Sequence, residues 1–219
     1  MDVVIAGAHG KIARRLTRLL AGRGDRVRGL IRDPGHADDL RADGAEPVVC
    51  DLEGATTDEL AQAIAGADTV VFAAGAGPGS GAERKGSMDR DGAVKLLEAA
   101  VAAGVDGYLM VSSIGADDPP GGDDVFSAYL RAKAEADQAL IASDRTWTIV
   151  RPVSLTDDPG SGTVEISADP VSGKVSRDDV AAVLAAALQE PRTAQQIMYL
   201  RSGDSSVAEA LKRFLADSA

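Results

Sequence analysis

The chain has 219 residues, of which 45% are hydrophobic and 26% charged, a composition typical of a soluble globular protein with a substantial core. The formal net charge of −11 argues against a nucleic-acid partner and against an anionic membrane surface, because both attract clustered lysine and arginine. No apolar run approaches the length of a membrane span, and the chain begins inside a predicted strand rather than in a signal peptide. We therefore expect a cytoplasmic protein that acts on a small-molecule substrate, with its oligomeric state left open.

The residue types that build most metal and redox sites are scarce. Cys50 is the single cysteine, so no disulfide can form within the chain, and its place on a predicted strand favours a packed thiol. His9 and His36 are the two histidines, too few to predict a histidine-based metal site.

The first sixteen residues predict a buried strand, a glycine turn and a helix. Residues 3–6 are an apolar run, and apolar side chains then recur at helical spacing, at Ile12, Leu16, Leu19 and Leu20. Gly7 allows a sharp turn off the strand, Gly10 allows the backbone to approach a pyrophosphate, and Ala13 lets the helix pack near the sheet.

This turn fits a dinucleotide-binding fingerprint with the spacing G-x-x-G-x-x-A, in place of the commoner G-x-G-x-x-G. The alternative is a tight strand-to-helix turn that binds no ligand. The motif follows the first strand of an alternating chain, however, where doubly wound folds place their cofactor on a helix N-terminus. We expect the cofactor to contact Gly7, His9, Gly10, Lys11 and Ile12.

Apolar runs and helical patterns alternate as far as residue 152. Five more strands are predicted, at residues 26–32, 47–52, 68–75, 107–113 and 147–152. Helices are predicted between them, at residues 37–42, 58–65, 87–103 and 126–142. This order favours an α/β fold with a doubly wound, Rossmann-like parallel sheet, because right-handed crossovers place helices on both faces.

Residues 153–219 are predicted to form a small extension on the substrate side of this 1–152 core. Polar and short β-like pieces occupy residues 154–176, followed by a helix at 180–188, a strand at 196–200 and a helix at 207–215. No linker or repeat separates the two parts, so we expect a single NAD(P)-binding domain over residues 1–219.

The end of the second predicted strand bears on the choice between NAD and NADP. Arg32 stands there, and a guanidinium suits the additional phosphate of NADP by charge and by bidentate geometry; Lys11 could assist. Asp33 could instead bind the ribose hydroxyl of NAD, and Arg32 could be an ordinary solvated arginine. Because Arg32 comes before Asp33 at the end of the strand, the sequence favours NADP, with NAD as the alternative.

Later strand ends supply the rest of the predicted cofactor site. Asp51 and Leu52 lie at the tip of the third strand, where an acid can meet the adenine amino group. Ala73, Ala74 and Gly75 end the fourth strand, where small residues let the backbone pass beside the dinucleotide.

A serine pair, a tyrosine and a lysine could carry the chemistry. Tyr129 and Lys133 are four residues apart on one face of a predicted helix, and Ser112 and Ser113 end the strand before it. An ammonium beside a phenol helps that phenol to exchange a proton with a substrate oxygen, which a serine hydroxyl can hold. The alternative is a surface helix with a half-buried tyrosine and a solvated lysine.

Together these motifs resemble the atypical short-chain dehydrogenases/reductases, a Rossmann family similar to NAD-dependent epimerase/dehydratase and flavin reductase-like proteins. The resemblance runs over nearly the whole chain and rests on residues 7–13, 88–100, 112–113, 129–133, 151–153 and 175–181. It implies that Ser113, Tyr129 and Lys133 are catalytic, that Lys133 also binds the nicotinamide ribose, and that Pro152 passes beside the nicotinamide.

The chain departs from the extended epimerases at two places. Asp89 stands on the central helix where those enzymes carry asparagine, and a carboxylate that only accepts cannot bridge a proton relay as an amide does. The segment after residue 152 is also too short for the substrate domain of a sugar-nucleotide epimerase. The sequence therefore favours an NADP-dependent oxidoreductase acting on a small carbonyl or hydroxyl compound. The alternatives are a direct-hydride reductase of quinones or flavins, and a non-catalytic NADP-binding sensor.

Overall fold

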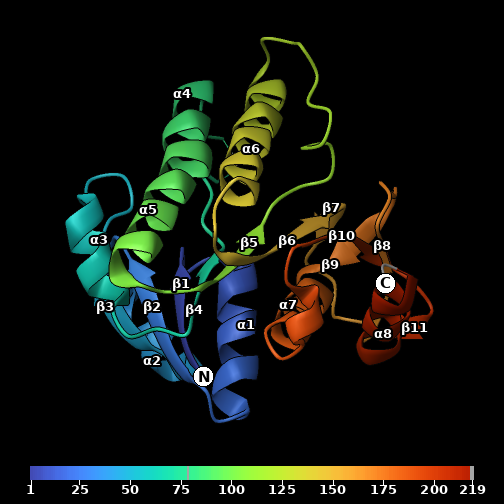
Figure 1. The fold of residues 1–219 in the computed structure, drawn as a ribbon, viewed down its shortest axis with the longest axis horizontal. Coiled ribbons are helices and arrows are strands. Elements are labelled where there is room, and N and C mark those ends of the chain that lie inside the picture. Colours follow the sequence, from blue (N-terminus) through green and yellow to red (C-terminus); the bar gives the residue numbers. More distant parts are fainter. Residues whose placement is uncertain (78, 218–219) are drawn as a thin grey trace.

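A twisted, mostly parallel sheet runs through the centre of the computed structural model, which describes residues 1–77 and 79–217. Its parallel strands follow the order β3-β2-β1-β4-β5-β6-β10, and helices cover both faces (Figure 1). The strands are β1 (Asp2–Ala6), β2 (Arg26–Ile31), β3 (Glu46–Val49), β4 (Thr69–Phe72), β5 (Gly107–Val111), β6 (Thr146–Pro152) and β10 (Gln196–Ser202). The predicted doubly wound α/β fold is confirmed.

The segment after β6 continues the same sheet. β8 (Thr163–Ser167) pairs antiparallel with β10, and β11 (Ser205–Ser206) pairs antiparallel with β8. β7 (Ser154–Thr156) and β9 (Lys174–Ser176) form a separate parallel pair. The seventh parallel strand, β10, is the one predicted at residues 196–200, and it lies beside β6.

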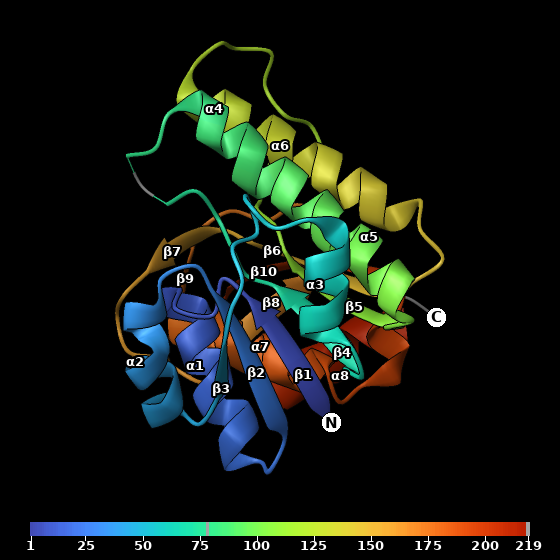
Figure 2. The same ribbon diagram turned by 90° about the vertical axis from the view of Figure 1, so that its left-hand side faces the viewer.

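The helices form two layers, one on each face of the sheet. Figures 1 and 2 show α5 and α6 on one side and α1 and α7 on the other. The helices are α1 (Lys11–Gly22), α2 (Ala37–Asp43), α3 (Thr57–Ile64), α4 (Ala82–Arg84), α5 (Ala93–Ala103), α6 (Val125–Ile141), α7 (Arg177–Ala187) and α8 (Val207–Asp217). Short helical turns are η1 (Pro34–His36) and η3 (Pro191–Thr193), and a π-helical segment, η2 (Lys85–Gly92), joins α4 to α5.

Two apolar cores lie on the two faces of the sheet, and β1 contributes to both. Val3 and Ile5 belong to the core under α1 and α7, whereas Val4 and Ala6 belong to the core under α3 and α5. Successive side chains of a strand point to opposite faces, so a continuous apolar run marks a strand that is buried on both. Within residues 1–77 and 79–217, no helix has both the length and the apolar character needed to cross a membrane.

Several strands end earlier than their apolar runs predict. β4 ends at Phe72, opposite Ala6, because β1 turns away at Gly7 and leaves no partner for a longer ladder. Arg32, Asp51 and Ser113 also lie just beyond the strands rather than within them. The polar residues of the site therefore stand on the loops at the carboxyl edge of the sheet.

The helix predicted at 87–103 begins earlier, at Ala82, and includes the π-helical segment η2. Residues 82–87 carry no apolar repeat, so periodicity could not extend the prediction to them. A π-helical turn inside a helix is frequently found at a functional site, and this one brings Met88 and Asp89 beside the end of β4.

Candidate functional site

A cleft of about 660 Å³ opens at the carboxyl edge of β1 to β4. Nine of the predicted cofactor residues line it: Gly7, His9, Gly10, Arg32, Asp51, Leu52, Ala73, Ala74 and Gly75. Further lining comes from Asp33, which was predicted only as the alternative ligand for NAD, and from residues that were not predicted to bind the cofactor: Leu30, Ile31, Pro34, His36, Cys50, Arg84 and Met88. The cleft brings together the ends of four strands that are distant in sequence, as a dinucleotide site at a switch point requires.

The glycine turn forms the floor of this cleft. Gly7 has a φ of +76°, and a Cβ added there would lie 2.5 Å from the Ala74 Cα, so no larger residue fits without displacing the backbone. The Gly10 N–H donates to the Gly7 carbonyl at 2.9 Å, which closes the turn. Helix α1 then begins at Lys11 with no side-chain cap, so its first N–H groups are available to phosphate oxygens.

Charged side chains stand at the rim of the cleft. Arg32 is 58% exposed, and its guanidinium lies 3.4 Å from a Glu53 carboxylate oxygen. Arg84 reaches the same oxygen at 3.2 Å. Burial alone would raise the pKa of Glu53, but hydrogen bonds from Ser87 and Arg84 hold it below its usual range. The glutamate therefore keeps two guanidiniums at one end of the cleft.

Arg84 was missed because residues 82–87 lack an apolar pattern, so the predicted helix began after it. Met88 lay inside the predicted helix, but nothing in the sequence signalled that its side chain would line the cleft. His36 was missed because nothing in its neighbourhood signals a contact with the glycine turn; only the adjacency of β1 and β2 brings it there. Cys50 is half-buried in the cleft wall, and burial raises the pKa of its thiol. A raised pKa disfavours the reactive thiolate.

Asp33 is occupied by a local structural contact. One of its carboxylate oxygens accepts the Gly35 N–H at 2.8 Å and caps the short turn η1. The predicted alternative role of this carboxylate, binding a ribose hydroxyl, would compete with that cap.

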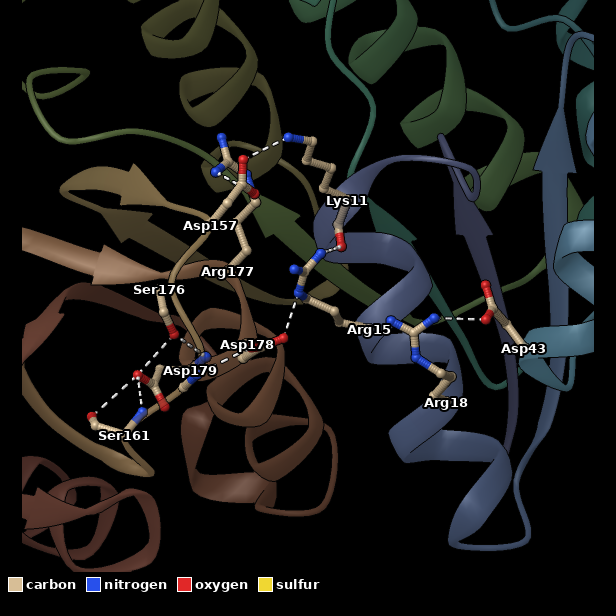
Figure 3. A network of polar contacts seen from close by, with 11 residues as sticks. Lys11, Arg15, Arg18, Asp43, Asp157, Ser161, Ser176, Arg177, Asp178 and Asp179 are labelled. Carbon is tan, nitrogen blue, oxygen red and sulfur yellow. Dashed lines mark hydrogen bonds and ion pairs between the residues drawn. The ribbon is translucent and has the colours of Figure 1, made fainter.

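Lys11 and Ile12 do not line the cleft. The Lys11 ammonium contacts Asp157 at 2.6 Å, and the Arg177 guanidinium meets the same carboxylate at 2.9 Å (Figure 3). Beside them, Arg15 pairs with Asp178. These contacts tie the start of α1 to the segment after β7 and the start of α7. Ile12 packs against the apolar core instead.

The predicted catalytic side chains lie outside the cleft lining. Ser113 is half-buried, and its hydroxyl donates to the Ile114 carbonyl at 3.2 Å. The Tyr129 ring is half-buried, with the Lys85 ammonium 5.1 Å from its centroid and the Phe126 ring 6.1 Å away. Over residues 1–77 and 79–217, no hydrogen bond joins Ser113, Tyr129 and Lys133.

The side chain of Lys133, on α6, is buried against the end of β5. Its ammonium donates to the Val111 carbonyl at 2.9 Å and lies 5.2 Å from the centroid of the Phe72 ring. The Asp89 carboxylate, also buried, lies 3.8 Å from the same ammonium and accepts the Ala76 N–H at 3.1 Å. Asp89 therefore links Lys133 to the loop after β4, where Gly75 lines the cleft.

Ser112, the first serine of the pair, has a structural role. Ser112 donates to Asp137 at 2.7 Å, and Arg151 donates to the same carboxylate oxygen at 3.1 Å. Arg151 also donates to the Tyr199 hydroxyl at 2.6 Å. Burial raises the pKa of Asp137, and the contacts with Ser112 and Arg151 oppose that rise. Ser112 is therefore held within a buried polar network, which Ser113 does not join.

Pro152 is buried in β6, and its carbonyl accepts the Ile114 N–H at 3.1 Å. Its ring does not line the cleft, although it lies on the strand next to the one that Ser113 follows. In the part of the chain that the structure describes, no group of three or more His, Cys, Asp or Glu residues is arranged to hold a metal ion.

Comparison with known proteins adds to this geometry. Residues 7–191 match the model of a family described as NAD(P)H-binding. An uncharacterized sugar epimerase, YhfK of Bacillus subtilis, is 39% identical over 97% of this chain and 100% of its own length. The ceramide reductase of Caulobacter vibrioides is 33% identical over 86% of this chain and 61% of its own length.

A solved structure shares the whole fold. A putative NAD-dependent epimerase/dehydratase from Bacillus halodurans is 34% identical, with a TM-score of 0.91 over 97% of this chain and 99% of that one. The family match begins at Gly7, the first residue of the glycine turn, and it spans the cleft and the predicted catalytic residues. The chain belongs to the NAD(P)H-binding family of Rossmann-like epimerases and reductases.

Proposed function

We propose that this protein is an NADP-dependent oxidoreductase that acts on a small carbonyl or hydroxyl compound. The observation that carries the proposal is the cleft, where a glycine turn, an uncapped helix N-terminus and an exposed guanidinium lie along one edge of the sheet. NADP can use all three features: the turn and the helix N-terminus suit its pyrophosphate, and the guanidinium suits its additional phosphate.

The preference for NADP rests on the contrast between Arg32 and Asp33. The Arg32 side chain is mostly exposed and has a long, 3.4 Å contact with Glu53, so it is free to turn toward a phosphate. Asp33 is already used as the cap of η1. NAD recognition requires a carboxylate that binds the ribose hydroxyl. Asp33 would have to give up the cap of η1 to do so, and that loss would oppose the binding of NAD.

In this proposal the chemistry rests on Ser113, which follows β5, and on Tyr129 and Lys133 of α6. The nicotinamide of the bound cofactor would supply or accept the hydride. The Tyr129 hydroxyl would exchange a proton with the substrate oxygen, and the Ser113 hydroxyl would hold that oxygen. An ammonium has three N–H donors, and Lys133 uses one on Val111, which leaves donors for a ribose hydroxyl.

A second candidate is a reductase that passes hydride directly to a quinone or a flavin. The observation that favours it is the separation of Tyr129 from Lys133: the tyrosine ring contacts Lys85 and Phe126, whereas the lysine faces Val111 and Asp89. A direct transfer to an electrophilic ring does not need a proton from Tyr129. The name of the Caulobacter relative, ceramide reductase, supports reduction as the class of reaction for either candidate.

The test measures NADPH oxidation with panels of carbonyl compounds, quinones and flavins, for the wild type and Ser113→Ala. The proposal expects turnover of a carbonyl compound and a loss of about 10-fold or more in Ser113→Ala, since the oxygen loses a donor. Ser143→Ala is the matched control, because its hydroxyl also donates to a carbonyl but lies beyond the far end of α6.

Turnover restricted to quinones or flavins and unchanged in Ser113→Ala would replace the first candidate by the second. Tight NADPH binding without turnover of any acceptor would indicate a sensor that binds NADP.

A further inference from the structure

The two histidines of the chain meet face to face in the cleft. The His9 and His36 rings are parallel to within 5°, and their centroids are 3.6 Å apart. His9 belongs to the glycine turn after β1, and His36 ends η1 after β2. Because β1 and β2 are parallel neighbours, their following loops meet at one edge of the sheet. Both rings line the cleft beside Gly10 and Arg32.

Each ring has a carboxylate near its Nε2 atom. The His9 Nε2 atom lies 2.8 Å from Asp39 of α2, and the His36 Nε2 atom lies 3.9 Å from Asp33. The His9 contact and the nearby Arg14 hold the pKa of Asp39 below its usual range. The histidine side chains are 31% and 40% exposed, so a ligand in the cleft can reach both.

Further charges surround the pair. From α1, Arg14 lies 3.4 Å from the Asp39 carboxylate and also binds Asp43, which Arg18 contacts as well. From the strand end, Arg32 faces Glu53 rather than either histidine. The stack lies between these ion pairs, and histidine is the side-chain type whose charge changes near neutral pH.

The stack limits how many protons the pair can hold without a ligand. Two imidazolium rings at this separation repel each other, since each would carry a positive charge in a site that is only partly open to solvent. A phosphate anion placed against the rings would remove that penalty. Protonation of the second ring and binding of the anion should therefore favour each other.

We propose that the His9–His36 stack is a proton-linked subsite for a phosphate group of the dinucleotide, so that cofactor binding takes up a proton from solvent. The proposal rests on the proposed function, because it assumes that the cleft binds a dinucleotide. It adds a regulation of that same site: the affinity for the cofactor rises as the pH falls.

The first experiment is calorimetric titration with NADPH and with NADH, between about pH 6.5 and about pH 8.5 and in two buffers of different ionisation enthalpy. NADPH affinity should rise as the pH falls, by up to about tenfold per pH unit for one linked proton. The buffer dependence of the heat should report proton uptake. A pH dependence seen with NADPH alone would mean that the stack binds the 2′-phosphate, which is the additional phosphate of NADP. A pH dependence seen equally with NADH would mean that the stack binds the pyrophosphate.

His36→Gln and His9→Asn keep a hydrogen-bonding side chain but cannot be protonated, and each should remove most of the pH dependence. Arg41→Gln is the matched control: it removes a positive charge from α2, where Arg41 is exposed and pairs with Asp38, and it should leave the dependence intact. The chain has two histidines, so nuclear magnetic resonance of the imidazoles can follow both directly. Addition of NADP⁺ should move both titration midpoints to higher pH.

Tight binding of NADPH with no pH dependence and no proton uptake would overturn the proton-linked subsite and leave the proposed cofactor in place. A pH dependence that survives in both histidine variants would also overturn it. Failure of the wild type to bind either dinucleotide would instead reject the proposed function, and this proposal with it.

Discussion

The half of the molecule that holds the glycine turn and the half that holds Ser113, Tyr129 and Lys133 are built in different ways. Around the turn, the site depends on the backbone: Gly7 has a positive φ, Gly10 closes the turn, and small residues end β4 beside it. Near the end of β5, the site depends on long side chains, and neighbouring groups already occupy several of them.

This difference explains why the sequence predicts the first half better than the second. A backbone turn is specified by residues that adjoin each other in the chain, so a local motif describes it well. A long side chain such as Lys133 selects its partner among groups from several elements, here Val111 and Asp89. The four-residue spacing of Tyr129 and Lys133 places both on one helix face but does not make them contact each other.

The largest expected effect tests the backbone half. Gly7→Ala should destabilise the fold by about 3 kcal/mol or more, since it combines a positive φ with a Cβ 2.5 Å from the Ala74 Cα. NADPH binding should be lost as well. Denaturant unfolding and calorimetric titration measure the two effects.

Gly22→Ala is the matched control for this change. Gly22 ends α1, and an added Cβ there would meet no atom within 4 Å, so alanine should be neutral or slightly stabilising. If Gly7→Ala unfolds at the wild-type denaturant concentration and still binds NADPH, the turn does not depend on glycine as described.

The next effect tests the side-chain half. If Tyr129 donates the proton, Tyr129→Phe should lower turnover of a carbonyl substrate about 100-fold, the usual scale of general acid–base catalysis. The ring and its contacts with Lys85 and Phe126 remain, so the fold and NADPH affinity should persist. Steady-state NADPH oxidation measures the change.

Tyr108→Phe is the control for the loss of a phenol hydroxyl. Tyr108 is buried and donates to the Ala93 carbonyl, so the change should cost about 1 kcal/mol of stability without lowering turnover. Full activity of Tyr129→Phe would reject the tyrosine mechanism and leave direct hydride transfer as the better account.

Arg32→Ala tests the rim of the cleft around the glycine turn. NADPH affinity should fall about tenfold, equivalent to about 1.4 kcal/mol, while NADH affinity stays unchanged, because the variant loses the proposed contact between the guanidinium and the additional phosphate. Arg26→Ala is the matched control. Arg26 begins β2, the strand that Arg32 follows, and it lies at the opposite edge of the sheet. The two side chains are similarly exposed, 60% for Arg26 and 58% for Arg32. Equal affinity of the wild type for both cofactors would transfer the role to Asp33.

The sequence predicted the sheet and most of the cleft because both follow from local patterns. Apolar runs marked β1, β2, β4, β5 and β6, and their carboxyl ends necessarily meet at one edge. The sequence did not predict that Lys11 binds Asp157 or that His36 stacks on His9, since these contacts join segments that the fold alone brings together. Arg84 was missed because the π-helical segment that follows it begins without an apolar repeat.

The smallest expected effect concerns the ion pairs that join α1 to α2. Asp43 ends α2, its side chain is 7% exposed, and Arg14 and Arg18 of α1 both contact it. Burial would raise its pKa, but the two guanidiniums hold that pKa below its usual range. A carboxyl with a lowered pKa in the folded state stabilises the fold above its unfolded pKa, near 3.9, and loses this contribution as the pH falls further.

Asp43→Asn should therefore lower the free energy of unfolding by about 1 kcal/mol at neutral pH, and the difference from the wild type should shrink as the pH falls below about 4. Asp38→Asn is the matched control, since Asp38 lies on the same helix with its side chain 98% exposed, and an exposed ion pair contributes little. Urea unfolding over this pH range measures both. A difference that stays constant down to the lowest pH would show that Asp43 acts through packing rather than through its charge.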